Sequence, residues 1–238
     1  MAPRLTPLAG AAVALVLSSG LLGACGGSSS PSSSGNGIAS KSPKEIVAET
    51  RAAAEKASSV HVSGSIASAS TPIALNLDLA AGRGGRGQLS EGGVGFEVIQ
   101  TGGTVYIKGS PAFYRRIGGP AAAQLLQGKW LKAPATSSDF ASISSLTDLR
   151  KLIDSALASE GKLSKSATKS VNGQAVVGVT DVTRGGTLYV AVKGTPYPVA
   201  IVKSGTSGGK VNFGRWNEPV TITPPANAID ISQLRSSK

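Results

Sequence analysis

Residues that carry chemistry are scarce in this 238-residue chain, which has one cysteine, one histidine and one methionine, with aromatics at 4%. The single cysteine, Cys25, excludes a disulfide within the chain. With so few aromatics, the core has to be built from Val, Ile, Leu and Ala, while 31 glycines supply turns. This composition favours a sheet-rich fold with many turns.

The same scarcity limits catalytic and metal-binding sites. A metal site usually takes several His, Cys or clustered carboxylates, whereas His61 stands alone on the polar face of a predicted strand and is interpreted as a surface residue. The glycine-rich stretch Gly82–Gly87 lacks the Gly-Lys-Ser/Thr ending of a phosphate loop and is interpreted as a strand connection. We therefore expect no metal, no cofactor and no enzymatic activity.

The charge balance is strongly basic, with a formal net charge of +11. Residues 1–24 carry one charged side chain, Arg4, so that 23 basic and 13 acidic residues remain beyond them, a net charge of +10. This balance favours anionic partners such as lipid headgroups or wall polymers. Nucleic acid is disfavoured as a partner, because the basic residues are scattered and are not interleaved with aromatics.

The first 24 residues predict a signal peptide. Arg4 forms a short positive region, and the uncharged, mostly apolar stretch Leu8–Leu22 is shorter than the about 20 residues of a membrane-spanning helix. The sequence Leu22-Gly23-Ala24-Cys25 resembles the bacterial lipobox, which implies that diacylglycerol is attached to Cys25 and that cleavage occurs before it. An ordinary signal peptide with a free or buried cysteine, and an uncleaved membrane anchor, are the alternatives.

A lipid anchor of two or more acyl chains would hold the chain stably on the membrane. We expect it on the outer face of the cytoplasmic membrane. Residues 25–40 predict the lipidated cysteine and a flexible tether rich in Ser and Gly, with a reach of roughly 20 Å. Residues 41–238 are predicted to form one domain.

Helix signals occur before and between two runs of strand signals. Ser42, Pro43 and Glu45 predict a capped helix that runs to about Ala57. Shorter helical pieces are predicted at 112–117 and 121–127. The segment Ser145-Leu146-Thr147-Asp148 offers another helix start, and the apolar spacing over 149–157 predicts an amphipathic helix that ends near Gly161.

Alternating apolar and polar residues predict half-buried strands. The candidate strands are residues 60–66, 73–79, 87–90, 95–100, 104–108, 128–132, 162–170, 174–181, 187–192, 198–204, 210–216 and 220–223. Strands in two runs with helices before and between them predict an α+β fold built on one large antiparallel sheet of about ten or eleven strands. So many twisted strands should curl into a partial barrel.

The order of several short motifs resembles that of the mycobacterial LppX/LprG lipoprotein family and, more distantly, of LolA/LolB-like carriers. The motifs are the lipobox at Cys25, Ser58–Gly64, Val105–Gly109, Gly128–Trp130, Val171–Gln174, Leu188–Val190 and Pro219–Pro225. The resemblance implies a strongly curved half-barrel sheet with helices over its concave face. It also implies an apolar cavity for acyl chains and a role in binding or moving lipids or lipoglycans within the cell envelope.

The lining of such a cavity can be proposed from the apolar faces of the first two strands and of the amphipathic helix: Val60, Val62, Ile66, Ile73, Leu75, Leu77, Leu79, Leu149, Leu152, Ile153 and Leu157. The alternative is that these residues pack a solid core. In that case the chain would be an anchored interaction or structural module without lipid cargo, whose partner is an envelope protein or an anionic polymer.

Overall fold

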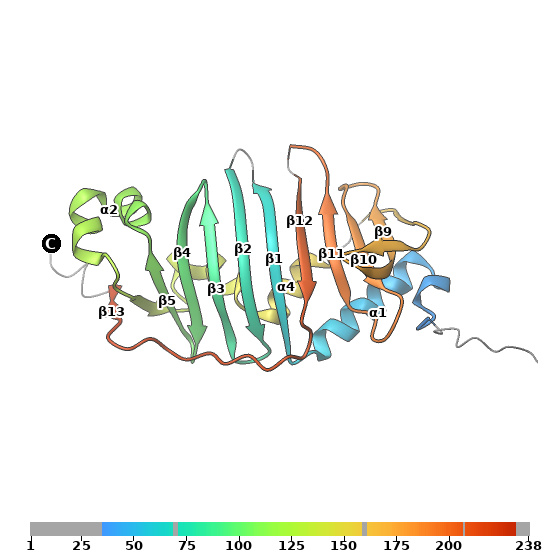
Figure 1. Ribbon diagram of the computed structural model, residues 1–238, viewed down its shortest axis with the longest axis horizontal. Coiled ribbons are helices and arrows are strands. Elements are labelled where there is room, and N and C mark those ends of the chain that lie inside the picture. The colour runs from blue at the N-terminus through green and yellow to red at the C-terminus, as the bar shows by residue number, and fades with distance from the viewer. Residues whose placement is uncertain (1–34, 69–70, 159–160, 207, 232–238) are drawn as a thin grey trace, which may run out of the picture. The chain divides into compact units, whose positions relative to one another are not determined.

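The computed structural model describes residues 35–231 except 69–70, 159–160 and 207. Cys25 and the predicted leader lie outside the described residues. Within them the helices are α1 (Pro43–Lys56), α2 (Pro111–Leu126), α3 (Ala141–Leu146) and α4 (Leu149–Ala156). The strands are β1 (Ser59–Ser68), β2 (Thr71–Ala80), β3 (Gly84–Glu91), β4 (Val94–Thr101), β5 (Thr104–Gly109), β6 (Leu131–Pro134), β7 (Leu163–Lys165), β8 (Lys169–Val171), β9 (Gln174–Asp181), β10 (Thr187–Ala191), β11 (Pro198–Lys203), β12 (Gly209–Gly214) and β13 (Ile229–Asp230) (Figure 1).

The predicted helix signals are confirmed. The Ser42 hydroxyl accepts a hydrogen bond from the Glu45 N–H, and the Glu45 carboxylate accepts one from the Ser42 N–H, which completes the capping box of α1. These hydrogen bonds from Ser42 lower the pKa of the Glu45 carboxyl. The two pieces predicted in the 112–127 region form α2, whose halves meet at a kink where Gly119 has φ 77° before Pro120.

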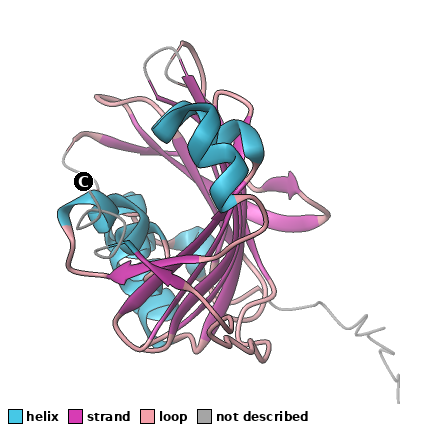
Figure 2. Ribbon diagram, turned by 90° about the vertical axis from the view of Figure 1, so that its left-hand side faces the viewer, coloured by secondary structure: helices cyan, strands magenta, loops and turns pink. Residues whose placement is uncertain are grey.

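All strands belong to one sheet of thirteen strands in the order β13-β6-β5-β4-β3-β2-β1-β12-β11-β10-β9-β7, with β8 also paired to β9. Every pair is antiparallel except β6 and β13, which are parallel, so that the sheet is mixed. The predicted α+β half-barrel is confirmed, and the sheet is open. Figure 2 shows it nearly edge-on as a curve with helices on its inner side.

The two faces of the sheet differ in chemistry because side chains alternate along each strand. The register brings one row of inward positions together across neighbouring strands: Phe213, Val62, Leu77, Gly87, Val98, Ile107 and Leu131. Most of these side chains are buried in the main core cluster, together with residues of α1 and α4. The concave face is therefore the apolar one.

Three predicted strands differ from the structure, and Gly84–Gly87 of the predicted connection Gly82–Gly87 belong to β3. The strand predicted at 128–132 is found at Leu131–Pro134 as β6. The 162–170 segment is divided into β7 and β8, and 220–223 is not a strand. Instead, the chain from Trp216 to β13 runs along one edge of the sheet, across the ends of several strands (Figure 1). Pro219, Pro224 and Pro225 flank or follow the alternating residues, and proline has no N–H to donate to a sheet ladder.

The described core is self-contained. Its hydrophobic clusters draw their residues from Ile38 through Ile231. A chain that starts at Gly26 therefore keeps every element and every core residue that the structure describes. None of the helices in the described residues is long and apolar enough to cross a membrane.

Candidate functional site

A hollow of about 340 Å³ lies between the concave face of the sheet and the helices α3 and α4. Its walls come from β1, β2, β11 and β12 on one side and from α3 and α4 on the other. Most of the lining is apolar: Val62, Ile66, Leu75, Leu146, Leu152, Ala156, Ile201, Val211 and Phe213. The remaining lining residues are Ser145, Ser155, Lys203, Gly208 and Gly209. The volume is at the low end of the about 300–1,000 Å³ typical of ligand pockets.

One end of this hollow is closed where the turn between α3 and α4 touches the sheet. A Cβ on Gly85 of β3 would lie 2.9 Å from the Thr147 carbonyl oxygen and 2.5 Å from Leu79 Cδ2, so only glycine allows the turn to come this close. The buried Thr147 hydroxyl also hydrogen-bonds Gln100 of β4. The α3–α4 turn is therefore in direct contact with β3 and β4 of the sheet.

The helix α4 is capped at its start and held by α1 near its end. At its start, the Asp148 carboxylate accepts hydrogen bonds from the N–H groups of Arg150 and Lys151 at 3.0 and 3.1 Å. Near its end, Arg51 of α1 donates to Asp154 Oδ1 at 2.9 Å and to the Leu157 carbonyl at 2.8 Å. Since α1 packs against both α4 and β9, it fixes the distance between α4 and the sheet.

The opposite end of the hollow reaches solvent. Ile66 near the end of β1 is 41% exposed, although it contributes to the apolar lining. Beside it, β1 and β12 approach closely at glycine: a Cβ on Gly209 would lie 2.3 Å from the Ser65 carbonyl oxygen. Exposed Ser145, Ser155 and Lys203 form a polar rim around this end.

A second, smaller hollow of about 140 Å³ adjoins the first. The two share Ala156, Ile201 and Lys203 in their linings. The smaller one continues under the end of α4 toward Leu163, Val179 and Leu188 of the β7–β10 region. The apolar space on the concave face is therefore extended along the sheet, with Ile201 at the junction.

Of the eleven lining residues predicted from the sequence, five line one of the two hollows and six do not. Val62, Ile66, Leu75 and Leu152 line the larger hollow, and Leu157 lines the smaller one. Ile73 is half-buried, and the remaining five are fully buried in the core: Val60, Leu77, Leu79, Leu149 and Ile153. Whether any of them contacts a ligand stays a prediction.

The β11–β12 side of the hollow was missed by sequence reasoning. Val211 and Phe213 alternate with Lys210, Asn212 and Gly214, and this alternation marks them as inward-facing. Ile201 lies in the unbroken apolar run 198–202, where alternation indicates no face. The sequence therefore indicated the inward face of β12 but not that of β11. What the sequence did not indicate is that β12 pairs with β1 and so brings this face next to Val62.

A larger depression of about 590 Å³ lies near α2 over β2 to β5 and has a different character. Its lining includes the outward row of Asn76, Gln88, Glu97 and Lys108, which alternates with the apolar inward residues. Lys108 forms an ion pair with Glu97 at 2.8 Å and lies 5.0 Å from the centre of the Trp130 ring. The lining also includes Leu75, Leu89 and Phe96, so it is mixed and less apolar than that of the hollow under α3 and α4.

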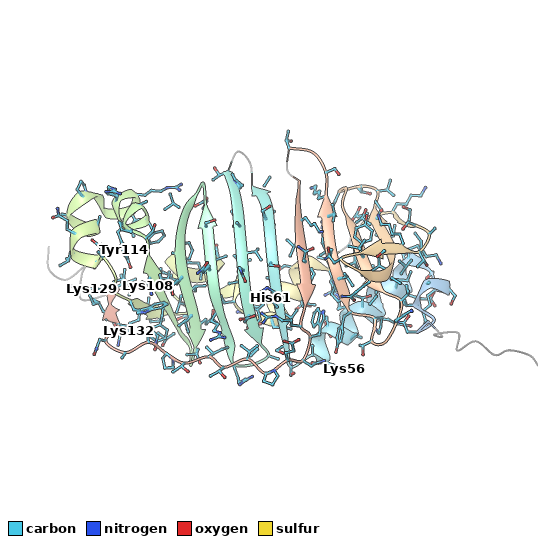
Figure 3. All side chains as sticks on the ribbon, viewed as in Figure 1. Lys56, His61, Lys108, Tyr114, Lys129 and Lys132 are labelled. Carbon is cyan, nitrogen blue, oxygen red and sulfur yellow. The ribbon has the colours of Figure 1, made fainter. Side chains whose placement is uncertain are left out.

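The single histidine lies on the convex face, paired in register with Asp78. His61 Nδ1 is 2.8 Å from Asp78 Oδ1 and 2.6 Å from Arg215 Nη2, and Arg215 also contacts Asp78. The three side chains join β1, β2 and the segment after β12; Figure 3 labels His61. Among the residues that the structure describes, no group of three or more His, Cys, Asp or Glu is placed to hold a metal ion.

Comparisons with known proteins give a match in structure and not in sequence. The sequence matches no protein-family model and no curated protein. The crystal structure of LprF from Mycobacterium bovis is similar, with a TM-score of 0.55 and 17% identity over 78% of this chain and 97% of that chain. The crystal structure of the Mycobacterium tuberculosis lipoprotein LppX gives a TM-score of 0.49 at 17% identity, over 76% of this chain and all of that one. The likeness to LprF confirms the fold that the LppX/LprG resemblance implied.

Proposed function

We propose that this chain, which has the fold of LprF, is an envelope lipoprotein that holds an acyl chain of a lipid or lipoglycan in the hollow under α3 and α4. The observation that carries the proposal is the apolar lining of a 340 Å³ space on the concave face of the sheet. Burial of each methylene group there would contribute about 0.8 kcal/mol. The proposed role is to carry or present the lipid, without a catalytic step.

The extent and the rim of the hollow support the same occupant. The smaller adjoining hollow extends the apolar space along the sheet, as a linear hydrocarbon requires. Lys203 is exposed at the rim, where a headgroup would leave the apolar space. A cation in that position suits a negatively charged headgroup.

The test is to look for lipid that copurifies with the unacylated chain starting at Gly26. The protein is extracted with organic solvent, and the extract is analysed by mass spectrometry. Ile201→Trp would fill the junction of the two hollows, whereas Val202→Trp places the same side chain on the opposite face of β11 and serves as the matched control.

We expect stoichiometric lipid in extracts of the wild type and of Val202→Trp, and little in those of Ile201→Trp. Both variants should show native circular dichroism. A wild-type extract without lipid, or an Ile201→Trp protein that retains the same lipid at the same level, would rule out the proposal. Retention of an envelope protein in place of lipid would favour the interaction-module alternative.

We also propose that Cys25 carries the lipid anchor and that the domain lies outside the cytoplasmic membrane. The lipobox-like Leu22-Gly23-Ala24-Cys25 supports this attachment. In cells fed labelled palmitate, the wild-type chain should take up label and sediment with membranes, and Cys25→Ser should remain unlabelled and uncleaved. An unlabelled wild-type protein in the soluble fraction would contradict the anchor.

A further inference from the structure

The helix α2 exposes large apolar side chains that the fold does not use. Four large hydrophobic residues stand out as exposed in the described part of the chain: Ile66, Ile117, Leu125 and Val182. Ile66 belongs to the mouth of the hollow, whereas Ile117 and Leu125 are both on α2 and are 59% and 58% exposed. Their exposure therefore needs an explanation other than core packing.

Other apolar residues of α2 pack against the sheet and fix the helix to it. Phe113 packs on Phe96 of β4, with ring centres 5.0 Å apart. Tyr114, Ala123 and Leu126 are buried in a small cluster with Leu131 of β6. The Tyr114 hydroxyl accepts a hydrogen bond from the Gly109 N–H and donates one to the Lys129 carbonyl, both at 2.9 Å. This anchoring holds the helix with Ile117 and Leu125 facing outward.

The surroundings of these apolar residues are basic. Between Glu97 and Asp139 the sequence has no acidic residue and five basic ones: Lys108, Arg115, Arg116, Lys129 and Lys132. Figure 3 shows Lys108, Lys129 and Lys132 at the same end of the sheet as α2.

Acidic residues from neighbouring elements balance only part of this charge. Lys108 pairs with Glu97 at 2.8 Å, Arg116 lies 3.9 Å from Glu91, and Lys132 is next to Asp230 in the β6–β13 register. Arg115 and Lys129 are exposed and add further positive charge.

We propose that this surface, formed by Arg115, Arg116, Ile117, Leu125 and Lys129 and called here the α2 surface, docks on a bilayer that contains anionic lipid. Basic side chains beside exposed aliphatic ones match the headgroups and the acyl boundary of such a bilayer. A soluble anionic polymer would use the charges but leave Ile117 and Leu125 unused. The α2 surface lies at the opposite end of the sheet from α1 (Figure 1).

The test measures binding of the unacylated chain from Gly26 to vesicles by cosedimentation. Vesicles of phosphatidylcholine alone are compared with vesicles of phosphatidylcholine and phosphatidylglycerol in equal amounts. Binding to the anionic vesicles should exceed binding to the neutral ones and should fall with added salt. Arg115→Gln with Arg116→Gln should weaken it about fivefold per removed charge.

Matched variants distinguish the effect of the α2 surface on vesicle binding from the effects of net charge and of exposed apolar side chains elsewhere. Lys44→Gln with Lys56→Gln removes two exposed charges from α1, and Val182→Ser removes a side chain as exposed as Ile117. These controls should bind like the wild type, apart from a small uniform effect of net charge. Ile117→Ser with Leu125→Ser should lose binding to anionic vesicles while the unfolding midpoint stays unchanged.

Two outcomes would overturn the proposal. Equal binding by the α2 variants and by the controls would show that net charge alone is responsible. Full binding by Ile117→Ser with Leu125→Ser, together with competition by dextran sulfate, would assign the surface to an anionic polymer. Neither outcome depends on lipid in the hollow, because the Ile201→Trp protein should bind vesicles like the wild type.

Discussion

At the scale of single residues, the contact between the α3–α4 turn and the sheet depends on Gly85. No side chain fits between β3 and the Thr147 carbonyl, because a Cβ would lie 2.9 Å from that oxygen. We expect Gly85→Ala to lower the free energy of unfolding by about 1–3 kcal/mol, as overpacked sites do. Urea denaturation measures the effect.

Gly214 of β12 offers the matched control. A Cβ there would meet nothing within 4 Å, and Gly214→Ala should change the free energy of unfolding by no more than about 0.5 kcal/mol. Equal effects of the two substitutions would contradict the close contact at Gly85.

Tyr114 gives a second residue-scale prediction. Burial raises the pKa of its phenol above the ordinary value near 10. Because the unfolded chain ionises first, stability is complete below about pH 10 and falls as the pH rises toward the folded-state pKa. Tyr114→Phe should remove this alkaline loss, while at neutral pH it costs about 1–3 kcal/mol for the two hydrogen bonds.

Free energies of unfolding at neutral and alkaline pH, compared between the wild type and Tyr114→Phe, measure this linkage. If both proteins lose the same stability at alkaline pH, another group is responsible for the loss.

At the scale of elements, α4 depends on its cap as well as on its apolar stripe. Asp148→Ala leaves the Arg150 and Lys151 N–H groups without their acceptor and should cost about 1 kcal/mol. Asp148→Asn keeps an acceptor oxygen and should restore most of that stability. Hydrogen exchange of the α4 amides should quicken in the alanine variant alone. Equal exchange in both variants would argue against the cap.

The positions of the helices could be predicted from the sequence, whereas the depth of the hollow could not. Caps and periodicity are local signals, and they correctly located α1, both halves of α2 and α4. Alternation revealed which side chains face inward, but not how deep the space above them is. Leu77 and Leu75 have the same pattern, yet only Leu75 lines the hollow, because the distance between helix and sheet is set by long-range contacts such as that of Gly85 with Thr147.

At the scale of the whole domain, the open sheet has two ends that must resist pairing with other chains. One end is covered by β7, of three residues, and the other by β13, of two. The Ile229 N–H donates to the Trp130 carbonyl at 2.8 Å, and Ile229 and Ile231 pack against the Tyr114 cluster. Short outer strands of this kind leave little edge exposed.

A chain that ends at Pro225 should therefore expose β6 and aggregate, because it loses both the hydrogen bond and the apolar cover of the Tyr114 cluster. A chain that ends at Ile231 keeps β13 and should behave like the full-length protein. Light scattering after size-exclusion chromatography distinguishes them. A monodisperse Pro225 truncation with an unchanged unfolding midpoint would show that β13 is dispensable.

The contact of Arg51 with α4 has a mechanical consequence. The helix α1 leads into β1 near the middle of the sheet. Its Arg51 also hydrogen-bonds α4, which forms one wall of the hollow. A rotation of α1 would therefore tilt α4 relative to the sheet. Residues ahead of α1 are themselves fixed, because Asn36 donates hydrogen bonds to the carbonyl groups of Ala191, Val192 and Gly194, and Ile38 is buried in the core. A pull on the chain before Asn36 would therefore be borne first by this contact beyond the end of β10, and the position of α4 over the hollow would be shielded from it.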